Sequence, residues 1–248
     1  MFVDIPIVDN STPITLNTAA TWKATNGYNK ENETVYFPLV LGTDGNKYHI
    51  SVLAAANFQE LLVDQYGIPY RTASNTECTI ISNLYLGEAN TGRIYDDSII
   101  NEKLNKNGIA SAVYVGGRWA IWGAHSADYN QDNITYVNAA ETNRMMLYYI
   151  SNDFQARRSL DVDQPLTVND IKSIVSQEQT RLDALLNIGA LTYGEVTINA
   201  SAQAASDLLT EGWTFAFNVT TTPLAQALKA IVTWTEDGFA TYFETEEA

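Results

Sequence analysis

The stretch that decides the fold is Glu141-Thr142-Asn143-Arg144-Met145-Met146, where an amphipathic helix opens. Met146, Ile150 and Phe154 recur at intervals of four residues, which gives this helix a single apolar face. Asn138, with Glu141 three residues later, predicts a capping box at its start. We expect the apolar face to lie in the core of the second half of the chain.

A second helix follows the first. Thr167, with Asp170 three residues later, predicts its start, and Gly189 within Asn187-Ile188-Gly189-Ala190-Leu191 predicts its end. Its apolar positions follow a helical period: Ile171, Ile174, Val175, Leu182, Leu185 and Leu186. We expect Ile174, Leu182 and Leu185 to pack against the face of the first helix.

Strands are predicted after these helices. Apolar Trp213, Phe215, Phe217 and Val219 alternate with polar or small residues, which is typical of a half-buried strand. Residues 229–235 predict a second strand of the same domain. Residues 239–244, after the turn Asp237-Gly238, predict a third strand or a loose extension. The second half is therefore predicted to be α+β, with a strand-forming arm at its end.

The first half predicts strands that alternate with helices. Thr34 to Leu41 is a strong β run in which Pro38 marks a bulge or an edge. Ser51 predicts the cap of a helix that stops at Gly67, and Asp96 or Asp97 caps a shorter one. Two strands, at residues 109–115 and 118–122, are joined by the hairpin turn Gly116-Gly117.

These patterns predict an α/β fold in two parts. A layered α/β sheet domain occupies residues 1–130, and an α+β domain occupies residues 131–248. The boundary falls in a polar loop near residues 127–133.

Composition excludes several classes of function. The chain has 248 residues, a formal net charge of -15 and a pI near 4.3, so it repels nucleic-acid backbones and anionic lipid. No apolar run is long enough to span a membrane. The single cysteine, Cys78, rules out an internal disulfide and a cysteine-rich zinc site.

No pattern of residues predicts catalysis, a metal site or a cofactor. The only histidines, His49 and His125, have no second His or Cys at ligand spacing. Cys78 has no base within sequence reach and is interpreted as a buried apolar residue. The loop at residues 42–46 lacks the Lys-Ser/Thr ending of a phosphate loop and is interpreted as a hairpin turn.

Four tryptophans fall in predicted strands: Trp119, Trp122, Trp213 and Trp234. Core packing is the simpler interpretation. The alternative is a stacking platform for carbohydrate.

Several short motifs follow one another in order along the chain. They are Phe2-Val3-Asp4-Ile5-Pro6, Tyr36-Phe37-Pro38, Gly67-Ile68-Pro69-Tyr70 with Ser74-Asn75, Leu104-Asn105-Lys106-Asn107-Gly108-Ile109, and Trp122-Gly123-Ala124-His125-Ser126. Their order resembles that of contractile bacteriophage tail sheath proteins, a family also found in phage-tail-like bacteriocins and injection systems. Ala124 and His125 stand where the family usually has Asn and Arg.

The resemblance implies a structural subunit of a contractile sheath. Such a subunit polymerises around a tail tube and contracts to drive the tube through the target cell envelope. The implied partners are copies of itself in a helical or ring assembly, the tail tube protein, and baseplate or neck proteins. The implied location is the virion tail, made in the host cytoplasm. Direct binding of nucleic acid or membrane is not expected.

The resemblance leaves alternatives open. Sheath proteins usually carry a linker arm before the strand with which this chain begins, so the chain is expected to be a fragment, a split product or a minimal sheath. A sheath-like cap or initiator that does not contract is one rival. A carbohydrate-binding module is another, and a hydrolase with scattered acids is a third for which no constellation is visible.

The C-terminal end of the chain is the candidate functional segment. Sheath arms add strands to a neighbour's sheet, and main-chain hydrogen bonds supply the missing ladder in such pairing. We expect the inter-subunit arm to consist of Phe239, Thr241, Tyr242, Phe243 and Glu244. The alternative is an edge strand of its own domain.

Overall fold

The computed structural model describes residues 1–88, 96–132, 134–198, 212–228, 230–236 and 239. Its described part contains helices, one mixed sheet and three small antiparallel sheets, which confirms the predicted α/β class. Two clusters of buried apolar side chains form the core. One draws on residues 5–127, and the other draws on residues 146–196. The predicted division between residues 130 and 131 stays a prediction.

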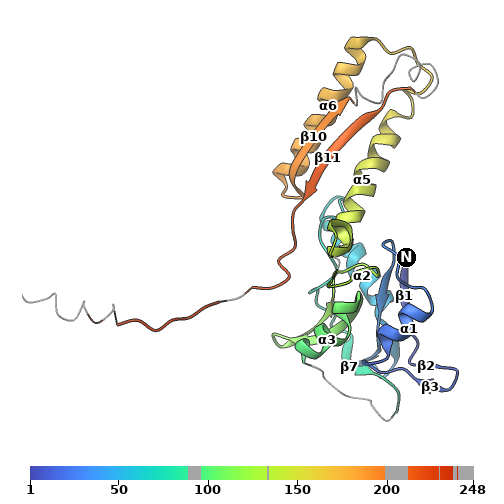
Figure 1. Cartoon of the computed structure of the whole chain (residues 1–248), viewed down its shortest axis with the longest axis vertical. Helices are drawn as coiled ribbons and strands as arrows, with labels where there is room; N and C mark the ends of the chain where they lie inside the picture. The colour runs from blue at the N-terminus through green and yellow to red at the C-terminus, as the bar shows by residue number, and fades with distance from the viewer. Residues whose placement is uncertain (89–95, 133, 199–211, 229, 237–238, 240–248) are drawn as a thin grey trace, which may run out of the picture.

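A four-stranded sheet forms the centre of the lower part of the molecule (Figure 1). Its order is β1 (Phe2–Asp4), β4 (Thr34–Tyr36), β8 (Ile109–Val115) and β9 (Arg118–Trp122). The first three strands run parallel, and β9 returns antiparallel from β8. The predicted hairpin at Gly116-Gly117 is confirmed, with both glycines at positive φ as a tight turn requires.

The β run from Thr34 to Leu41 is two strands rather than one. Pro38 offers no N–H to a ladder, and the chain changes sheet there. After it, β5 (Leu39–Gly42) lies between β6 (Lys47–His49) and β7 (Ile81–Tyr85) in an antiparallel sheet. Strand β7 was not predicted from the sequence.

Helices and short elements cover these sheets. They are β2 (Val8–Asp9), β3 (Thr12–Pro13), α1 (Ala19–Thr25), α2 (Ile50–Asp64), α3 (Asp97–Lys103) and the 3₁₀ turn η2 (Asn105–Asn107). Asp96 caps α3 as predicted, because its carboxylate accepts from the Ser98 N–H at 2.7 Å. The predicted Ser51 cap is wrong. Helix α2 begins at Ile50, and the Ser51 hydroxyl donates to Asp4 on β1.

The upper part of the molecule contains α4 (Tyr136–Ala139), α5 (Glu141–Arg158), α6 (Val168–Asn187), β10 (Leu191–Ile198) and β11 (Phe215–Thr221). The capping box of α6 is confirmed, with Thr167 and Asp170 as reciprocal partners. The box predicted for α5 is wrong. Asn138 pairs instead with Thr135 to cap α4, and α5 starts after Ala140 with no side-chain cap.

The strands after α6 differ in part from the prediction. Strand β11 is confirmed, but its partner β10 was not predicted. The strand predicted at residues 229–235 is wrong, because residues 230–235 adopt no strand and are exposed. Figure 1 shows this segment leading away from the rest of the molecule.

Candidate assembly surface

The β10–β11 hairpin rests on α6. Ile174, Leu182 and Leu185 on this helix are buried, as the period of the sequence predicted. Gly194 on β10 lies against Leu182 so closely that an added Cβ would be 3.1 Å from the Leu182 Cβ. Glycine at this position lets the strand approach the helix, and the hairpin gains a fixed, buried face.

A side chain of α6 closes the outer edge of β10. The Gln179 amide accepts from the Val196 N–H at 3.1 Å and donates to the Gly194 carbonyl at 3.0 Å. One carboxamide therefore makes the two bonds that a neighbouring strand would make. Both backbone groups consequently point away from β11.

The outer edge of β11 is open in its middle. Gly194 pairs with Val219 and Val196 pairs with Phe217, and in a non-hydrogen-bonded antiparallel pair both residues turn their N–H and C=O outward. Within the described residues no partner is recorded for those groups of Phe217 and Val219. Only at the end of the strand does the Tyr136 hydroxyl accept from the Thr221 N–H, at 3.0 Å. Among the described residues, the hairpin thus presents one edge that Gln179 closes and one edge whose middle has no recorded partner, which we call the free edge.

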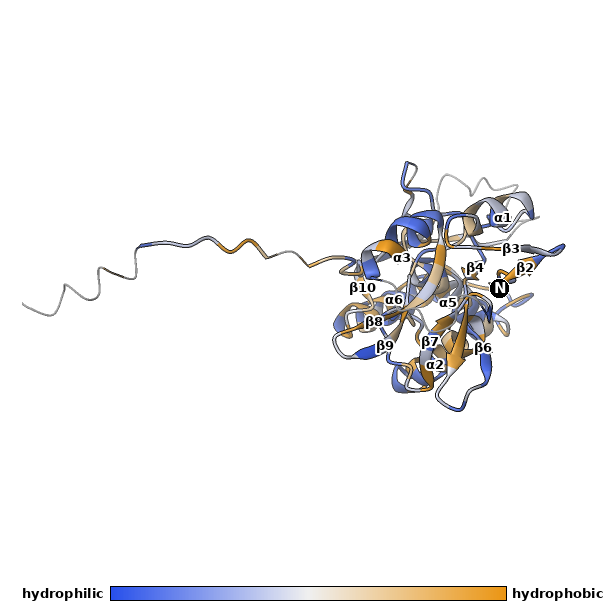
Figure 2. Ribbon diagram, turned by 90° about the horizontal axis from the view of Figure 1, so that it is seen from below, coloured by the Kyte–Doolittle hydropathy of each residue, from blue (hydrophilic) through white to orange (hydrophobic). Residues whose placement is uncertain are grey.

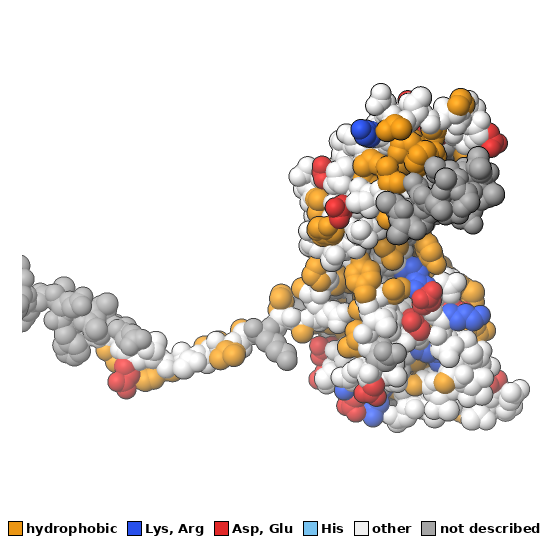
Figure 3. All heavy atoms as spheres, turned by 45° about the horizontal axis from the view of Figure 1, so that its top comes forward, with side chains coloured by type: hydrophobic (Ala, Val, Ile, Leu, Met, Phe, Trp, Pro, Cys, Tyr) orange, Lys and Arg blue, Asp and Glu red, His pale blue; other side chains and the backbone are white. Residues whose placement is uncertain are grey.

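Helix α5 packs on the same face through aromatic and aliphatic side chains. Met146 and Ile150 are buried as predicted, and Phe154 is half-buried. The Phe154 ring lies 5.5 Å from the Phe215 ring and 5.2 Å from the Phe217 ring. Figure 3 shows hydrophobic side chains gathered on the upper part of the molecule, where α6 and the hairpin lie.

A buried charge cluster ties α5 to α6. Glu178 on α6 is 1% exposed and accepts from both Arg157 and Arg158 at the end of α5. Arg157 also pairs with Asp153. Breaking a buried pair by removing one partner leaves an uncompensated charge, so this cluster fixes how the two helices meet.

The arm begins shortly after the end of β11. We use this name for residues 224–248, of which 224–228, 230–236 and 239 are described. Its root is bonded to the molecule, since the Gln226 side chain donates to the Ala139 carbonyl at 3.1 Å. Beyond the root, large apolar side chains are exposed to solvent: Leu228 by 91%, Ile231 by 93%, Val232 by 93% and Trp234 by 71%. Figure 2 shows the hydrophobic stretch that they form.

Of the residues predicted to form the inter-subunit arm, the structure describes Phe239. It is 54% exposed, and its ring lies 6.1 Å from the Trp234 ring. Thr241, Tyr242, Phe243 and Glu244 lie outside the described residues. The prediction that residues 229–235 belong to the domain's own sheet missed Ile231 and Val232 as arm residues. The signal that could have found them is the absence of a polar alternation that would bury one face.

The carboxyl of Glu141 joins the start of α5 to the lower part. It accepts from the Thr72 hydroxyl at 2.9 Å and from the Thr34 hydroxyl at 3.2 Å. Burial raises the pKa of Glu141 to about 7, although these hydrogen bonds oppose the rise. The group is therefore largely protonated below neutral pH.

The two histidines and the cysteine are the other chemical candidates. The His125 Nδ1 bonds the Ala139 carbonyl at 2.7 Å, and His49 pairs with Asp4 at 3.3 Å. Cys78 is buried, which raises its thiol pKa and confirms the apolar interpretation. Among the described residues no group of three or more His, Cys, Asp or Glu side chains could hold a metal ion.

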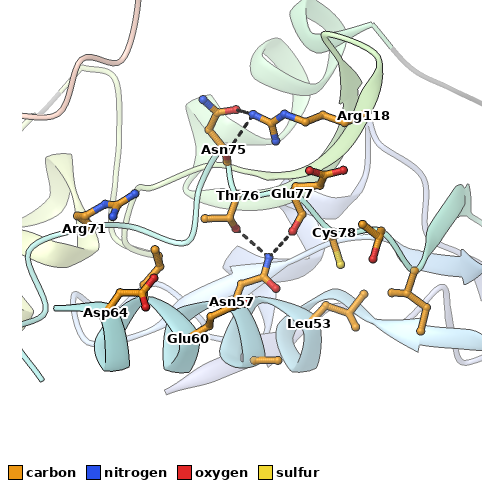
Figure 4. A pocket seen from close by; sticks show the side chains of 14 residues that line it. Leu53, Asn57, Glu60, Asp64, Arg71, Asn75, Thr76, Glu77, Cys78 and Arg118 are labelled. Atoms are coloured by element: carbon orange, nitrogen blue, oxygen red, sulfur yellow. Dashed lines mark hydrogen bonds between the residues drawn. The ribbon is translucent and has the colours of Figure 1, made fainter. Parts of the chain in front are cut away.

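An open groove of about 700 Å³ runs between α2 and residues 71–80 (Figure 4). The Asn57 amide bridges it by donating to the Thr76 hydroxyl at 2.8 Å and the Glu77 carbonyl at 3.1 Å. Arg118 on the opposite side donates to Asn75. These contacts tie α2 to the segment beside β9, and we assign the groove a structural role.

The fold is similar to that of several solved structures. A chain of the cryo-EM structure of the anti-feeding prophage baseplate matches with a TM-score of 0.70 and 14% identity, over 95% of this chain and 60% of that one. A chain of the contracted PVC sheath complex, from an extracellular contractile injection system, matches with a TM-score of 0.76 and 13% identity, over 96% and 64%. This chain has the fold of contractile sheath proteins.

The crystal structure of the sheath tail protein from Desulfitobacterium hafniense shares the sheath fold more loosely. Its TM-score is 0.52 at 10% identity, over 89% of this chain and 56% of that one. The chain thus spans less than two thirds of each of these three chains. No family model and no curated protein sequence matches it. Among the described residues, no helix is both long and apolar enough to cross a membrane.

Proposed function

We propose that this chain is a structural subunit of a contractile sheath, joined to its neighbours by strand exchange through the arm. It has no catalytic role in this proposal. Its partners are copies of itself in a helical or ring assembly, a tail tube protein and baseplate or neck proteins, within a virion tail or a related injection particle.

The exposure of the arm is the observation that carries this proposal. Four large apolar side chains lie more than two-thirds in solvent: Leu228, Ile231, Val232 and Trp234. Burying such a side chain contributes about 1.5–3 kcal/mol, so a free arm forgoes a large stabilisation. A contiguous exposed apolar segment of this kind marks an interaction site.

The free edge of β11 offers a binding site for such an arm. An extended segment that pairs with Phe217 and Val219 would satisfy their outward N–H and C=O groups, and its alternate side chains would meet the hairpin face. We place the arm of one subunit on the β11 edge of another. In this way each subunit gives one strand and receives one.

Electron microscopy of the purified chain tests this function. Full-length protein is expected to form tubes or rings, alone or with its tube protein. A chain that ends at Ala227 keeps the Gln226 anchor and is expected to stay monomeric. Tubes from the truncated chain would contradict strand exchange through the arm, and monodisperse full-length particles under all conditions would contradict the sheath role.

A second candidate is a sheath-like subunit that caps or initiates the polymer without contracting. The match to a chain of a baseplate structure favours it. The same micrographs separate the two, because a cap or initiator stops at a single ring where a sheath continues into a tube.

A further inference from the structure

A cavity of about 490 Å³ lies at the root of the arm. Its walls come from the segment around Ser74, from α3 and η2, from the end of β9 and the loop after it, and from arm residues 224–227. Its volume falls in the usual range of small-molecule sites. The described lining is almost uncharged, with Lys106 as its one ionic side chain and Trp122 and Tyr129 as aromatic ones.

Asn101 is held so that it offers a donor. Its Oδ1 accepts from the Trp122 indole N–H at 3.0 Å and from the Asn105 amide at 2.6 Å. These two bonds fix which end of the Asn101 amide carries the oxygen. Its Nδ2 has no recorded partner among the described residues, so it is a positioned donor whose N–H groups are available for hydrogen bonds.

Asn105 offers an acceptor beside it. The side chain is only 8% exposed, and its Oδ1 is buried with no hydrogen-bond partner. Gly123 borders this oxygen, because a Cβ added to Gly123 would lie 2.8 Å from it. An unsatisfied buried acceptor costs about 1–3 kcal/mol, which a ligand donor in the cavity would offset.

His125 and Ser74 extend the set. The Nδ1 of His125 donates to the Ala139 carbonyl at 2.7 Å, which leaves Nε2 of the neutral ring as an acceptor. The Ser74 Oγ accepts from the Gly123 N–H at 3.0 Å and keeps its own proton to donate. The cavity therefore holds donors and acceptors whose orientation is fixed by hydrogen bonds among its lining residues and, for His125, by the bond to the Ala139 carbonyl.

We propose that this cavity binds an N-acetylated hexosamine. An acetamido group carries one N–H and one C=O, which match the Asn105 Oδ1 acceptor and the Asn101 Nδ2 donor. Ring hydroxyls suit His125 and Ser74, and the apolar face of the sugar suits the aromatic side chains. A preorganised lining loses little entropy when the ligand binds.

Other ligands fit this chemistry less well. A nucleotide brings phosphates, for which the lining offers Lys106 alone on a chain with net charge -15. An extended peptide also carries amide N–H and C=O groups, and it is the competing occupant that the experiment must address.

Saturation-transfer NMR and titration of the full-length chain test the proposal. The probe is N,N′-diacetylchitobiose, and cellobiose is the matched sugar without acetamido groups. We expect chitobiose to bind with a Kd of about 1 mM or tighter, and cellobiose at least tenfold more weakly. Asn101→Asp keeps the oxygen that accepts from Trp122 and removes the free donor, so it should weaken chitobiose at least tenfold.

Two further variants serve as controls for the effect of Asn101→Asp. Asn152→Asp makes the same chemical change on an exposed face of α5 and should leave binding unchanged. Gln131→Ala removes an exposed lining residue without touching the Asn101 cluster and should weaken binding about twofold to fivefold, roughly one hydrogen bond. The proposal is overturned if chitobiose does not bind, if cellobiose binds equally, or if Asn101→Asp has no effect. Displacement of chitobiose by a peptide of residues 228–236, with that peptide the tighter binder, would overturn it too. These binding results do not depend on whether the chain polymerises.

Discussion

Strand β11 and the arm are similar in composition but differ in structure. Both are rich in aromatic and β-branched residues, and only a few residues separate them along the chain. Phe215 and Phe217 are half-buried against α5 and pair with β10, whereas Ile231 and Val232 are 93% exposed and pair with no strand among the described residues. β-Propensity therefore describes fit to a partner surface, and a strand forms only where a ladder and an apolar face are both supplied.

The largest expected effect comes from the core beneath β11. Leu182→Ala removes a fully buried side chain that packs against Gly194, and it should lower the free energy of unfolding by about 2–5 kcal/mol in denaturant melts. Leu228→Ala makes the same change in the arm and should cost less than about 0.5 kcal/mol. Equal costs for the two variants would mean that the arm packs on its own subunit.

The next effect concerns the junction below the hairpin. The pKa of Glu141 is about 7 in the folded chain and near 4.5 unfolded, so the folded state holds the proton more tightly. Its contribution to stability is full below pH 4.5 and is lost as the pH rises through 7. The 2.5-unit difference corresponds to about 3 kcal/mol.

Glu141→Gln tests this contribution, because the amide does not titrate. Relative to the variant, the unchanged chain should lose about 3 kcal/mol of unfolding free energy between about pH 5 and pH 8. The comparison between the two proteins removes other titrating groups, such as Lys23 and His125. A constant difference across that pH range would rule out a buried, titrating Glu141.

A smaller effect is expected at the blocked edge of the hairpin. Gln179→Ala removes the two bonds that close β10 and should cost about 1–2 kcal/mol. Gln155→Ala, an exposed glutamine on α5, is the control and should be neutral. If Gln179→Ala were also neutral, the β10 edge would not be closed by this side chain.

The smallest expected effect on stability is that of removing the arm. A chain that ends at Ala227 should melt within about 2 °C of the full-length chain, because the described residues of the deleted segment contribute no buried core. A drop of 5 °C or more, which is about 1–2 kcal/mol or larger for a chain of this size, would show that the arm stabilises its own domain.

Local patterns in the sequence predicted most of the fold. The Thr167–Asp170 box, the Gly116-Gly117 hairpin and the Met146–Ile150 face depend on residues close together in the chain, and all are confirmed. The errors arise where a distant partner decides. Strand β10 forms because α6 and β11 flank it, whereas residues 230–235 pair with no strand among the described residues.

The candidate site was predicted in part for the same reason. Position at the end of the chain and β-rich composition identified Phe239 and its neighbours as an arm. The free edge of β11 depends on register and on the Gln179 side chain, neither of which a single sequence reveals. The contribution of Asn101 and Asn105 to a cavity likewise requires knowing that α3 lies beside Trp122.

Amide hydrogen exchange at Phe217 and Val219 tests the central claim most directly, namely that the arm of one subunit adds a strand to β11 of another. In the chain that ends at Ala227, both amides should exchange quickly, because their N–H groups face solvent. Adding a peptide of residues 228–244, or assembling the full-length chain, should slow both by at least tenfold while leaving Asn218 nearly unchanged, since its amide already bonds β10. Unchanged exchange at Phe217 and Val219 in assembled full-length protein would contradict the account.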